Sequence, residues 1–295
     1  MITAVIFLTI LITYIVIWAT YRPQAKHNNG MLFSVKLPAE AMEHAEIRRI
    51  RDEYNRGFNR VSLLMAVLLV PLVLLYNFST YQVVYLFAWL TVFFIVMVLP
   101  FRKAFRETLA FKKKSRWANP ADDDEYWGNG FTYHNPKDRR LFVEKRLGGG
   151  YTVNTGTLAG KLIMGGTAAL FLAVIVGVSV MMIRSELDPP VMTITPDGRV
   201  EIDYQMYPFE FAAADIEELT LVDVMPPGRK TNGEATDKVA RGHFNLSEIG
   251  RARLYIFKDN PPYIRIKLPD VYVFYNENDP EKTLRLFEEL SRIRK

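Results

Sequence analysis

The sequence contains no cysteine, which excludes disulfides, thiol catalysis and cysteine-ligated metal sites. Histidine is scarce, with four residues in 295, and none has a Ser, Asp or second ligand at a recognisable spacing. Charge is also missing from long parts of the chain. No Asp, Glu, Lys or Arg occurs in residues 2–18, 61–76, 81–99 and 162–183.

These four charge-free stretches predict membrane spans. A helix needs roughly 20 mainly apolar residues to cross the bilayer hydrocarbon. We therefore expect four transmembrane helices, one in residues 1–21, two in 61–100 and one in 158–184. The first stretch lacks a positive n-region and a clear small-x-small cleavage site, which favours an uncleaved span over a signal peptide.

Basic residues predict the orientation of these spans, because cytoplasmic loops carry an excess of Lys and Arg. Residues 22–60 hold 8 Lys/Arg against 5 Asp/Glu, and residues 101–157 hold 12 against 7. Both segments are expected in the cytoplasm and both termini outside. The net charge of +5 is then an orientation signal, and we expect no nucleic-acid partner.

The spans carry no ionisable residue in their middle, whereas transporters usually place charged residues there along a path. The fourth span has small residues at every fourth position, which are Gly165, Ala169, Ala173 and Gly177. A stripe of small residues lets helices approach closely in lipid. We expect it to pack against another helix of this chain or to form a homo-oligomer.

Both predicted cytoplasmic segments contain helical patterns. In residues 22–60, "LFSVKLP" alternates like a short strand, and the following charged residues predict a helix that continues into the second span. After the third span, "FRKAFRETLAFKKKSRW" places Phe101, Phe105 and Leu109 on one helix face. This predicts a basic helix resting on anionic lipid, or simply a positive-inside anchor.

The tail, residues 191–295, has the pattern of an α+β domain. "VMTITPDGRVEI", "EELTLVDV", "RARLYIF", "YIRIKL" and "VYVFY" indicate about seven short strands separated by turns. Asp279 is an expected N-cap, followed by Pro280 at the first helical position. We therefore predict a strand-rich domain closed by one terminal helix.

This order resembles the bacterial PH domain family, in the stretch "GRARLYIFKDNPPYIRIKLPDVYVFYNENDPEKTLRLFEEL". The resemblance implies a PH-like β-barrel or sandwich capped by the helix, and a binding or scaffold role. Its first hairpin offers only Arg199 between Asp197 and Glu201, which departs from phosphoinositide-binding members. The candidate binding loop is "PPGRKTNGEATDKVARGHF", with Arg229, Thr231, Asn232 and Arg241; a plain polar loop is the alternative.

The stretch from Asp122 to Asn154 combines an acidic run, aromatic residues and a Gly triplet. The consecutive acids lack the alternating spacing of a calcium loop, so we expect a solvated lead-in. "LGGGYTVNTG" lacks the Lys-Ser/Thr ending of a P-loop. The segment resembles a motif of bacterial membrane proteins of unknown function. Its candidate docking residues are Tyr126, Trp127, Gly130, Tyr133, Asn135, Pro136 and Asp138.

The sequence thus predicts an α+β membrane protein of the bacterial cell membrane: four transmembrane helices, a small β-containing cytoplasmic loop and the PH-like domain. We expect a multipass binding, scaffold or sensor protein without catalytic residues, metal or cofactor. Its expected partners are membrane lipid and a protein or peptide. The alternatives are a small transporter or transporter subunit, a membrane immunity or signal-transduction protein, and an enzyme using the Asp122–Glu125 acids.

Overall fold

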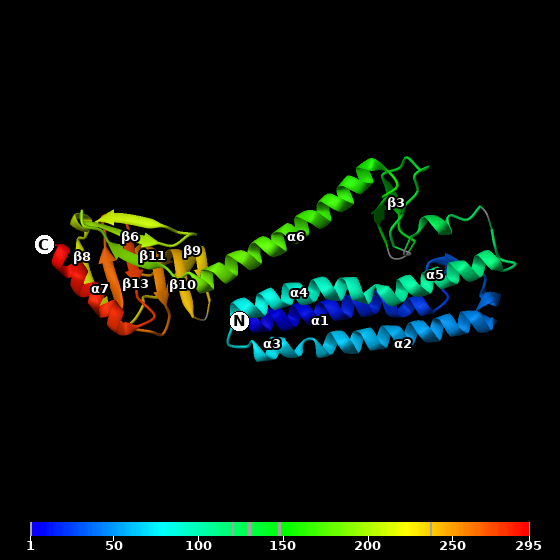
Figure 1. The fold of residues 1–295 in the computed structure, drawn as a ribbon, viewed down its shortest axis with the longest axis horizontal. Coiled ribbons are helices and arrows are strands. Elements are labelled where there is room, and N and C mark those ends of the chain that lie inside the picture. Colours follow the sequence, from blue (N-terminus) through cyan, green and yellow to red (C-terminus); the bar gives the residue numbers. More distant parts are fainter. Residues whose placement is uncertain (1, 120, 129–130, 147–148, 237, 295) are drawn as a thin grey trace. The chain divides into compact units, whose positions relative to one another are not determined.

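The computed structural model describes residues 2–119, 121–128, 131–146, 149–236 and 238–294. The chain forms two compact units, an N-terminal unit over residues 1–183 and a C-terminal unit over residues 184–295. The first is mainly helical and the second is rich in strands, so the α+β class is confirmed (Figure 1).

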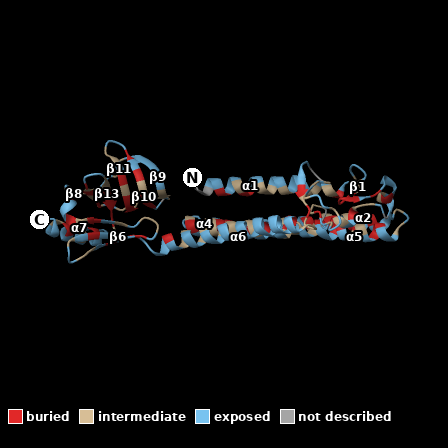
Figure 2. Cartoon of the chain, turned by 90° about the horizontal axis from the view of Figure 1, so that it is seen from above, coloured by how far each residue is buried: buried red, intermediate tan, exposed pale blue. Residues whose placement is uncertain are grey.

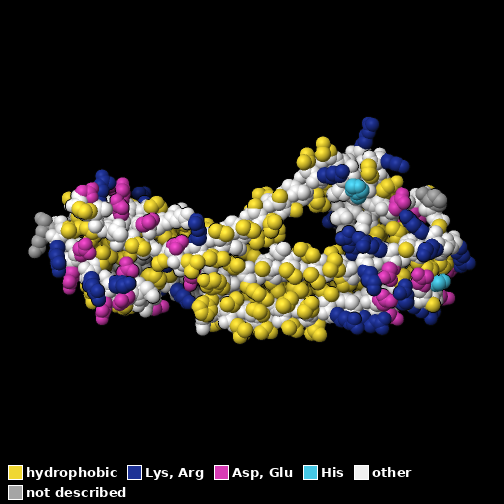
Figure 3. Space-filling model, viewed as in Figure 1, with side chains coloured by type: hydrophobic (Ala, Val, Ile, Leu, Met, Phe, Trp, Pro, Cys, Tyr) yellow, Lys and Arg dark blue, Asp and Glu magenta, His cyan; other side chains and the backbone are white. Residues whose placement is uncertain are grey.

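Helices dominate the N-terminal unit: α1 (Ile2–Tyr21), α2 (Ala45–Val67), α3 (Val70–Leu74), α4 (Ser79–Met97), α5 (Leu99–Lys114) and α6 (Leu158–Leu187). Among the described residues, four helical stretches are long and apolar enough to cross a membrane, as the sequence predicted. Apolar side chains cover the half of the surface around α3 and α4, whereas Lys and Arg gather around α5 (Figure 3).

Three of these stretches, including α6 with 30 residues, are longer than a bilayer requires. Two of the three consist of two consecutive helices. They comprise 30 residues across α2–α3 and 36 residues across α4–α5. At 1.5 Å per residue they measure about 45 and 54 Å, against roughly 30 Å of hydrocarbon. Each has a proline where its two parts meet, Pro71 near the start of α3 and Pro100 near the start of α5. We therefore expect the charged parts of these helices, residues 45–60 of α2 and 101–114 of α5, to extend beyond the hydrocarbon.

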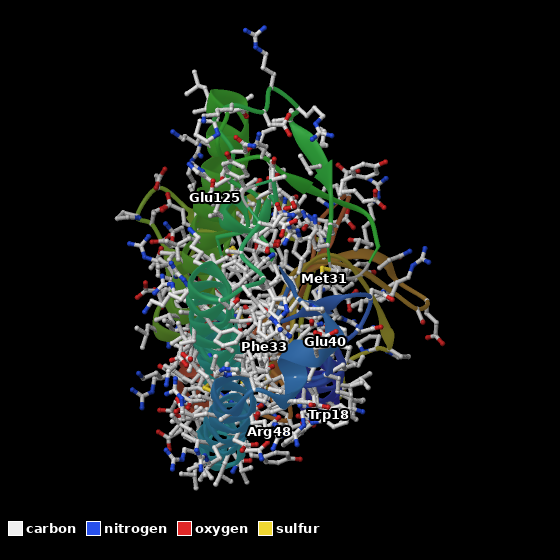
Figure 4. All side chains as sticks on the ribbon, turned by 90° about the vertical axis from the view of Figure 1, so that its right-hand side faces the viewer. Trp18, Met31, Phe33, Glu40, Arg48 and Glu125 are labelled. Atoms are coloured by element: carbon white, nitrogen blue, oxygen red, sulfur yellow. The ribbon has the colours of Figure 1, made fainter. Side chains whose placement is uncertain are left out.

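The apolar face of α5 packs inside the protein. Phe101 is fully buried and Phe105 nearly so. The Phe101 ring lies 4.8 Å from the ring of Phe131 and 6.2 Å from that of Phe33, which is labelled in Figure 4. The interpretation of this segment as a helix resting on lipid through these phenylalanines is therefore wrong. Its apolar residues hold the core of the N-terminal unit together.

Helix α6 differs from the others in its exposure. None of the residues in its apolar window is buried, and most of the helix is coloured as exposed in Figure 2. Gly165, Ala169, Ala173 and Gly177 are all exposed. A Cβ placed on either glycine would meet no atom within 4 Å. A packing role for this stripe, including homo-oligomerisation, stays a prediction.

Two small hairpins lie among these helices. β1 (Met31–Leu32) pairs with β2 (Val35–Lys36), so the stretch "LFSVKLP", predicted as one short strand, is divided by a turn at Phe33 and Ser34, both with positive φ. β3 (Phe142–Glu144) pairs with β4 (Tyr151–Val153) just before α6. Gly160, in the first turn of α6, lies so close to the end of this hairpin that an added Cβ would overlap the Asn154 carbonyl oxygen.

The C-terminal unit contains nine strands among the described residues: β5 (Val191–Ile194), β6 (Arg199–Asp203), β7 (Phe209–Ala212), β8 (Glu218–Val222), β9 (Gly228–Ala235), β10 (Val239–Leu246), β11 (Gly250–Phe257), β12 (Tyr263–Lys267) and β13 (Tyr272–Tyr275). Strands β5-β6-β7 form one sheet and β8-β12-β13-β11-β10-β9 another, and the described strands form no closed barrel. The β11–β13 pair is parallel. The terminal helix α7 (Pro280–Ile293) begins as predicted, with the Asp279 side chain accepting a hydrogen bond from the Glu281 amide.

The six-stranded sheet buries side chains on both faces, because neighbours along β11 point to opposite sides. Tyr255 belongs to the core that includes β5–β7 residues and Leu290 of α7. Leu254 and Ile256 belong to a second core with Phe244 of β10. The second core has no helix among its residues, and it borders the groove described below.

The close approach at Gly160 generates a first prediction. Gly160→Ala should lower the melting temperature of the detergent-solubilised protein, because overpacking a tight contact typically costs about 1–3 kcal/mol. Gly166→Ala is the matched control in the same helix, since its Cβ would meet no atom within 4 Å. Circular dichroism on heating measures both. Equal melting temperatures for the two variants would contradict the tight junction between α6 and the β3–β4 hairpin.

Candidate functional site

The acidic run in residues 122–124 forms an ion-pair cluster with a buried centre. Lys112 Nζ lies 2.5 Å from Oδ2 of Asp122 and 2.5 Å from Oδ2 of Asp124. The Arg146 guanidinium donates to Asp124 Oδ1 at 2.5 Å and also bonds Asp123. The side chains of Lys112, Asp124 and Arg146 are only 5%, 4% and 7% exposed. The expectation of a solvated lead-in is therefore wrong for Asp122 and Asp124, whereas the side chains of Asp123 and Glu125 are 44% and 55% exposed.

The cluster joins segments that are far apart in the sequence. Arg146 also donates to the Ser34 carbonyl oxygen at 2.7 Å, in the turn between β1 and β2. Lys36 of β2 donates to Asp123 Oδ1 at 3.0 Å. Lys112 comes from the end of α5, and Arg146 follows β3. We call this set of Lys36, Lys112, Asp122, Asp123, Asp124 and Arg146 the charge cluster.

An aromatic layer lies against the charge cluster. The Arg146 guanidinium lies over the Trp127 ring at 5.3 Å, a cation–π contact. Trp127 donates its indole N–H to Asp123 Oδ2 at 3.3 Å and is 1% exposed. The Tyr133 ring lies 5.2 Å from the Trp127 ring. Trp127 and Tyr133 thus hold the chain after the acidic run against the cluster.

Asn154 organises the second half of the motif. It is fully buried, and its Oδ1 accepts from the backbone N–H of Asn135 at 3.0 Å and of Gly156 at 2.9 Å. Its Nδ2 donates to the carbonyl oxygens of Asn135 and Asp138 at 3.0 and 2.8 Å. Because all four groups are backbone atoms, the Asn154 side chain fixes the turn around Pro136.

The predicted docking residues therefore differ in their exposure. Trp127 and Tyr133 are buried, and Asp138 accepts from the Tyr133 hydroxyl at 3.3 Å and pairs with Arg140 at 2.7 Å. Asn135 and Tyr126 are half-buried, and Pro136 is exposed. Gly130 lies outside the described residues. Of this set, Pro136 is the described residue most open to a partner, and a docking role stays a prediction.

The predicted binding loop of the tail is a β-hairpin, made of β9 and β10. Arg229 and Thr231 are exposed on β9, and Asn232 accepts from the Tyr207 hydroxyl at 3.2 Å. Arg241 is 3% exposed and donates to the Ser185 carbonyl oxygen at 2.5 Å. The loop assignment is therefore wrong, and Arg241 holds the last turn of α6 within the C-terminal unit.

A groove in the C-terminal unit was missed by sequence reasoning. It has a volume of about 620 Å³ and includes residues of β9, β10, β11 and β12. Its apolar wall includes Phe244, Leu246, Leu254, Ile256 and Tyr263. Val224, which also lines the groove, is 80% exposed. Lys230, Lys258, Asp223 and Asp259 add charges of both signs.

Other residues of these sites had no sequence signal of their own. Lys112 is one of three consecutive lysines, and Arg146 and Asn154 lie in the Asp122–Asn154 stretch without a role predicted for them. Among the described residues, no group of three or more His, Cys, Asp or Glu side chains could hold a metal ion.

Asp124→Asn tests the charge cluster. The substitution leaves Lys112 and Arg146 buried with one carboxylate fewer, so we expect the free energy of unfolding to fall by about 3–5 kcal/mol. Glu125→Gln is the control, because Glu125 and Lys113 are 3.6 Å apart and 55% and 59% exposed. The control should cost less than about 1 kcal/mol. Thermal melting in detergent measures both, and equal losses would contradict the buried cluster.

The lowered pKa of Asp123 predicts that the stability of the folded state depends on pH. Burial opposes its charged form, but the hydrogen bond from Lys36 and the charge of Arg146 outweigh burial and lower the pKa of Asp123 from 3.8 to about 2. A lowered pKa stabilises the folded state above about pH 4, and this stabilisation is lost as the pH falls toward 2. The melting temperature should fall more steeply over this interval in the wild type than in Asp123→Asn. Parallel pH profiles would contradict the pairing.

The chain is similar in part to a family of unknown function (DUF5808), whose model matches residues 136–161. The match begins at Pro136, covers the β3–β4 hairpin and Asn154, and ends in the first turn of α6 just after Gly160. The first half of the docking motif lies outside it. The chain matches no curated protein and no solved structure. The match thus covers the hairpin and its junction with α6, and the description of the family names no activity.

Proposed function

We propose that this chain is an integral membrane binding protein, a scaffold or sensor, whose C-terminal unit binds an extended peptide of a partner protein. The observation that carries the proposal is the apolar groove of about 620 Å³ beside the edge strand β9. A concave apolar pocket with a few polar groups is the usual form of a binding site. The four apolar helices supply the membrane anchor.

The position of β9 favours a peptide as the ligand. β9 is the end strand of the six-stranded sheet, paired on one side with β10. An edge strand offers unpaired backbone N–H and C=O groups, to which an extended peptide can add as a further strand. Gly228, Lys230 and Ala235 of β9 also line the groove. Alternate side chains of such a peptide would then enter the apolar wall.

The PH-like character of this unit is part of the proposal. The strand-rich unit ending in helix α7 supports it, and so does the sequence resemblance. A lipid-headgroup role at the first hairpin has less support, because Arg199 lies 3.6 Å from an Asp197 oxygen and 3.5 Å from a Glu210 oxygen. Its charge is thus already balanced by two carboxylates. We favour a protein ligand on this ground.

Two observations weigh against the alternatives. Polar side chains between the spans bond to backbone: Gln82 donates to the Leu72 carbonyl oxygen at 2.8 Å and Trp89 to that of Met65 at 3.0 Å. They therefore serve packing, which offers a transporter no evident polar path. The Asp122–Asp124 carboxylates are held by Lys112 and Arg146, which leaves them poorly suited to enzymatic acid–base work. We therefore propose a protein without enzymatic activity, in a bacterial cell membrane with both termini outside.

Val224→Glu tests the groove with little risk to folding, because Val224 is 80% exposed. Peptides are first selected from a random library on the full-length protein in lipid nanodiscs. Affinity of a selected peptide, measured by fluorescence anisotropy, should fall by about tenfold or more in the variant, since a charge would face the apolar wall. Val191→Glu is the matched control on β5, where Val191 is 48% exposed.

A proline scan of the peptide provides a further test of the proposal. Proline substitutions at alternate positions of the peptide should weaken binding if it pairs with β9, because proline removes a ladder hydrogen bond. Selected peptides that bind Val224→Glu and Val191→Glu equally well would rule out the groove. A library that yields no binder to the wild type would count against a peptide ligand altogether.

A further inference from the structure

A second groove lies in the N-terminal unit, between α2 and α5. Its volume is about 620 Å³, and it is lined by Ile50, Glu53, Tyr54, Arg56, Gly57, Arg60, Val61, Leu99, Pro100, Lys103, Ala104 and Glu107. The lining is mixed, with apolar residues and charged ends of long side chains. The charge cluster and the groove of the C-terminal unit do not share these residues.

The groove lies where apolar sequence changes to charged sequence on both helices. Arg60 is the last charged residue before the charge-free stretch 61–76, and Pro100 directly follows the charge-free stretch 81–99. Both residues line the groove. If the apolar stretches lie in the bilayer, the groove is at the level of the lipid headgroups. The flanking segments carry the basic excess that predicts the cytoplasmic side.

Charges in the groove divide into a paired and an unpaired set. Lys103 Nζ lies 2.9 Å from Glu53 Oε2 and 3.6 Å from Glu107 Oε1. Arg49 pairs with the same two carboxylates at 3.1 and 3.9 Å. Arg56 and Arg60 are exposed, and neither has an acidic partner in the part of the chain that the structure describes.

Two arginines without a carboxylate partner fit a phosphate group. They lie one helical turn apart on α2, so both guanidinium groups can reach one anion. Guanidinium forms bidentate, charge-assisted hydrogen bonds to phosphate oxygens. Val61, Leu99 and Pro100 offer apolar surface beside them. This combination of charge and apolar surface at one level matches a lipid with an anionic headgroup better than a soluble anion.

We propose that the α2–α5 groove is a binding site for an anionic phospholipid of the bilayer leaflet. Arg56 and Arg60 bind its phosphate, and the first part of an acyl chain lies along Val61, Leu99 and Pro100. Gly57 lines the groove opposite Pro100, so a side chain longer than a methyl group would extend into the groove. A Cβ on Gly57 would lie 3.8 Å from the Pro100 Cβ, which is ordinary contact.

Native mass spectrometry of the full-length protein, released from nanodiscs of equal parts phosphatidylglycerol and phosphatidylcholine, measures which lipid is retained. We expect the wild type to retain phosphatidylglycerol preferentially. The double substitution Arg56→Gln/Arg60→Gln should reduce this preference by about tenfold or more. Arg48→Gln is the control: Arg48 is an exposed arginine of α2 outside the groove, labelled in Figure 4, and its substitution should change the preference less than about twofold.

Gly57→Leu provides a second test that does not change charge. Its side chain would extend into the groove, so retention of both lipids should fall, whereas Gly57→Ala should retain lipid like the wild type. The proposal is overturned if the double arginine variant keeps the wild-type preference. It is also overturned if Gly57→Leu and Gly57→Ala retain the same amount of lipid, or if free glycerol phosphate displaces the lipid completely, which would indicate a soluble anion as the ligand.

Discussion

The Asp124 carboxylate, held between Lys112 and Arg146, is the interaction on which the charged half of the N-terminal unit depends. Isolated buried charges are costly, so each of these groups is stable only when its partners are in place. The partners come from α5, from the turn after β3 and, through Ser34 and Lys36, from the β1–β2 hairpin. The cluster closes only when three separate segments have reached their final positions, which favours one arrangement of the chain.

The charge cluster also explains why the aromatic residues beside it are internal. Trp127 donates one hydrogen bond to Asp123, and the Arg146 guanidinium lies over its ring. Tyr133 packs on Trp127. The side chains of Trp127 and Tyr133 thus make these contacts within the segment itself. A partner that approached this segment would meet its outer residues, Pro136 and the exposed Arg139 and Arg140. A motif rich in Trp and Tyr can therefore be a folding motif even where its composition suggests a binding surface.

Local patterns in the sequence predicted the elements that depend on residues close together in the sequence. The four apolar helices follow from charge-free stretches, and the start of α7 follows from Asp279 and Pro280. The charge cluster pairs residues 10 to 23 positions apart in the 112–146 region, with two partners from the β1–β2 hairpin, and no local period marks such pairs. The sequence predicts a loop at strand β9, because "GRKTNGEA" has no apolar alternation. An edge strand needs none, since both of its faces can be solvated.

The arginines show clearly that the sequence alone does not distinguish structural residues from candidate binding residues. Arg146 and Arg241 are buried, and each donates to a backbone carbonyl oxygen, that of Ser34 or of Ser185. Arg56 and Arg60 are exposed and have no acidic partner among the described residues. Arginine is always charged, so its role depends on whether the protein itself balances that charge. An exposed arginine can also be solvated by water alone, so the proposed role of Arg56 and Arg60 rests on their place in the α2–α5 groove, one helical turn apart and beside apolar surface.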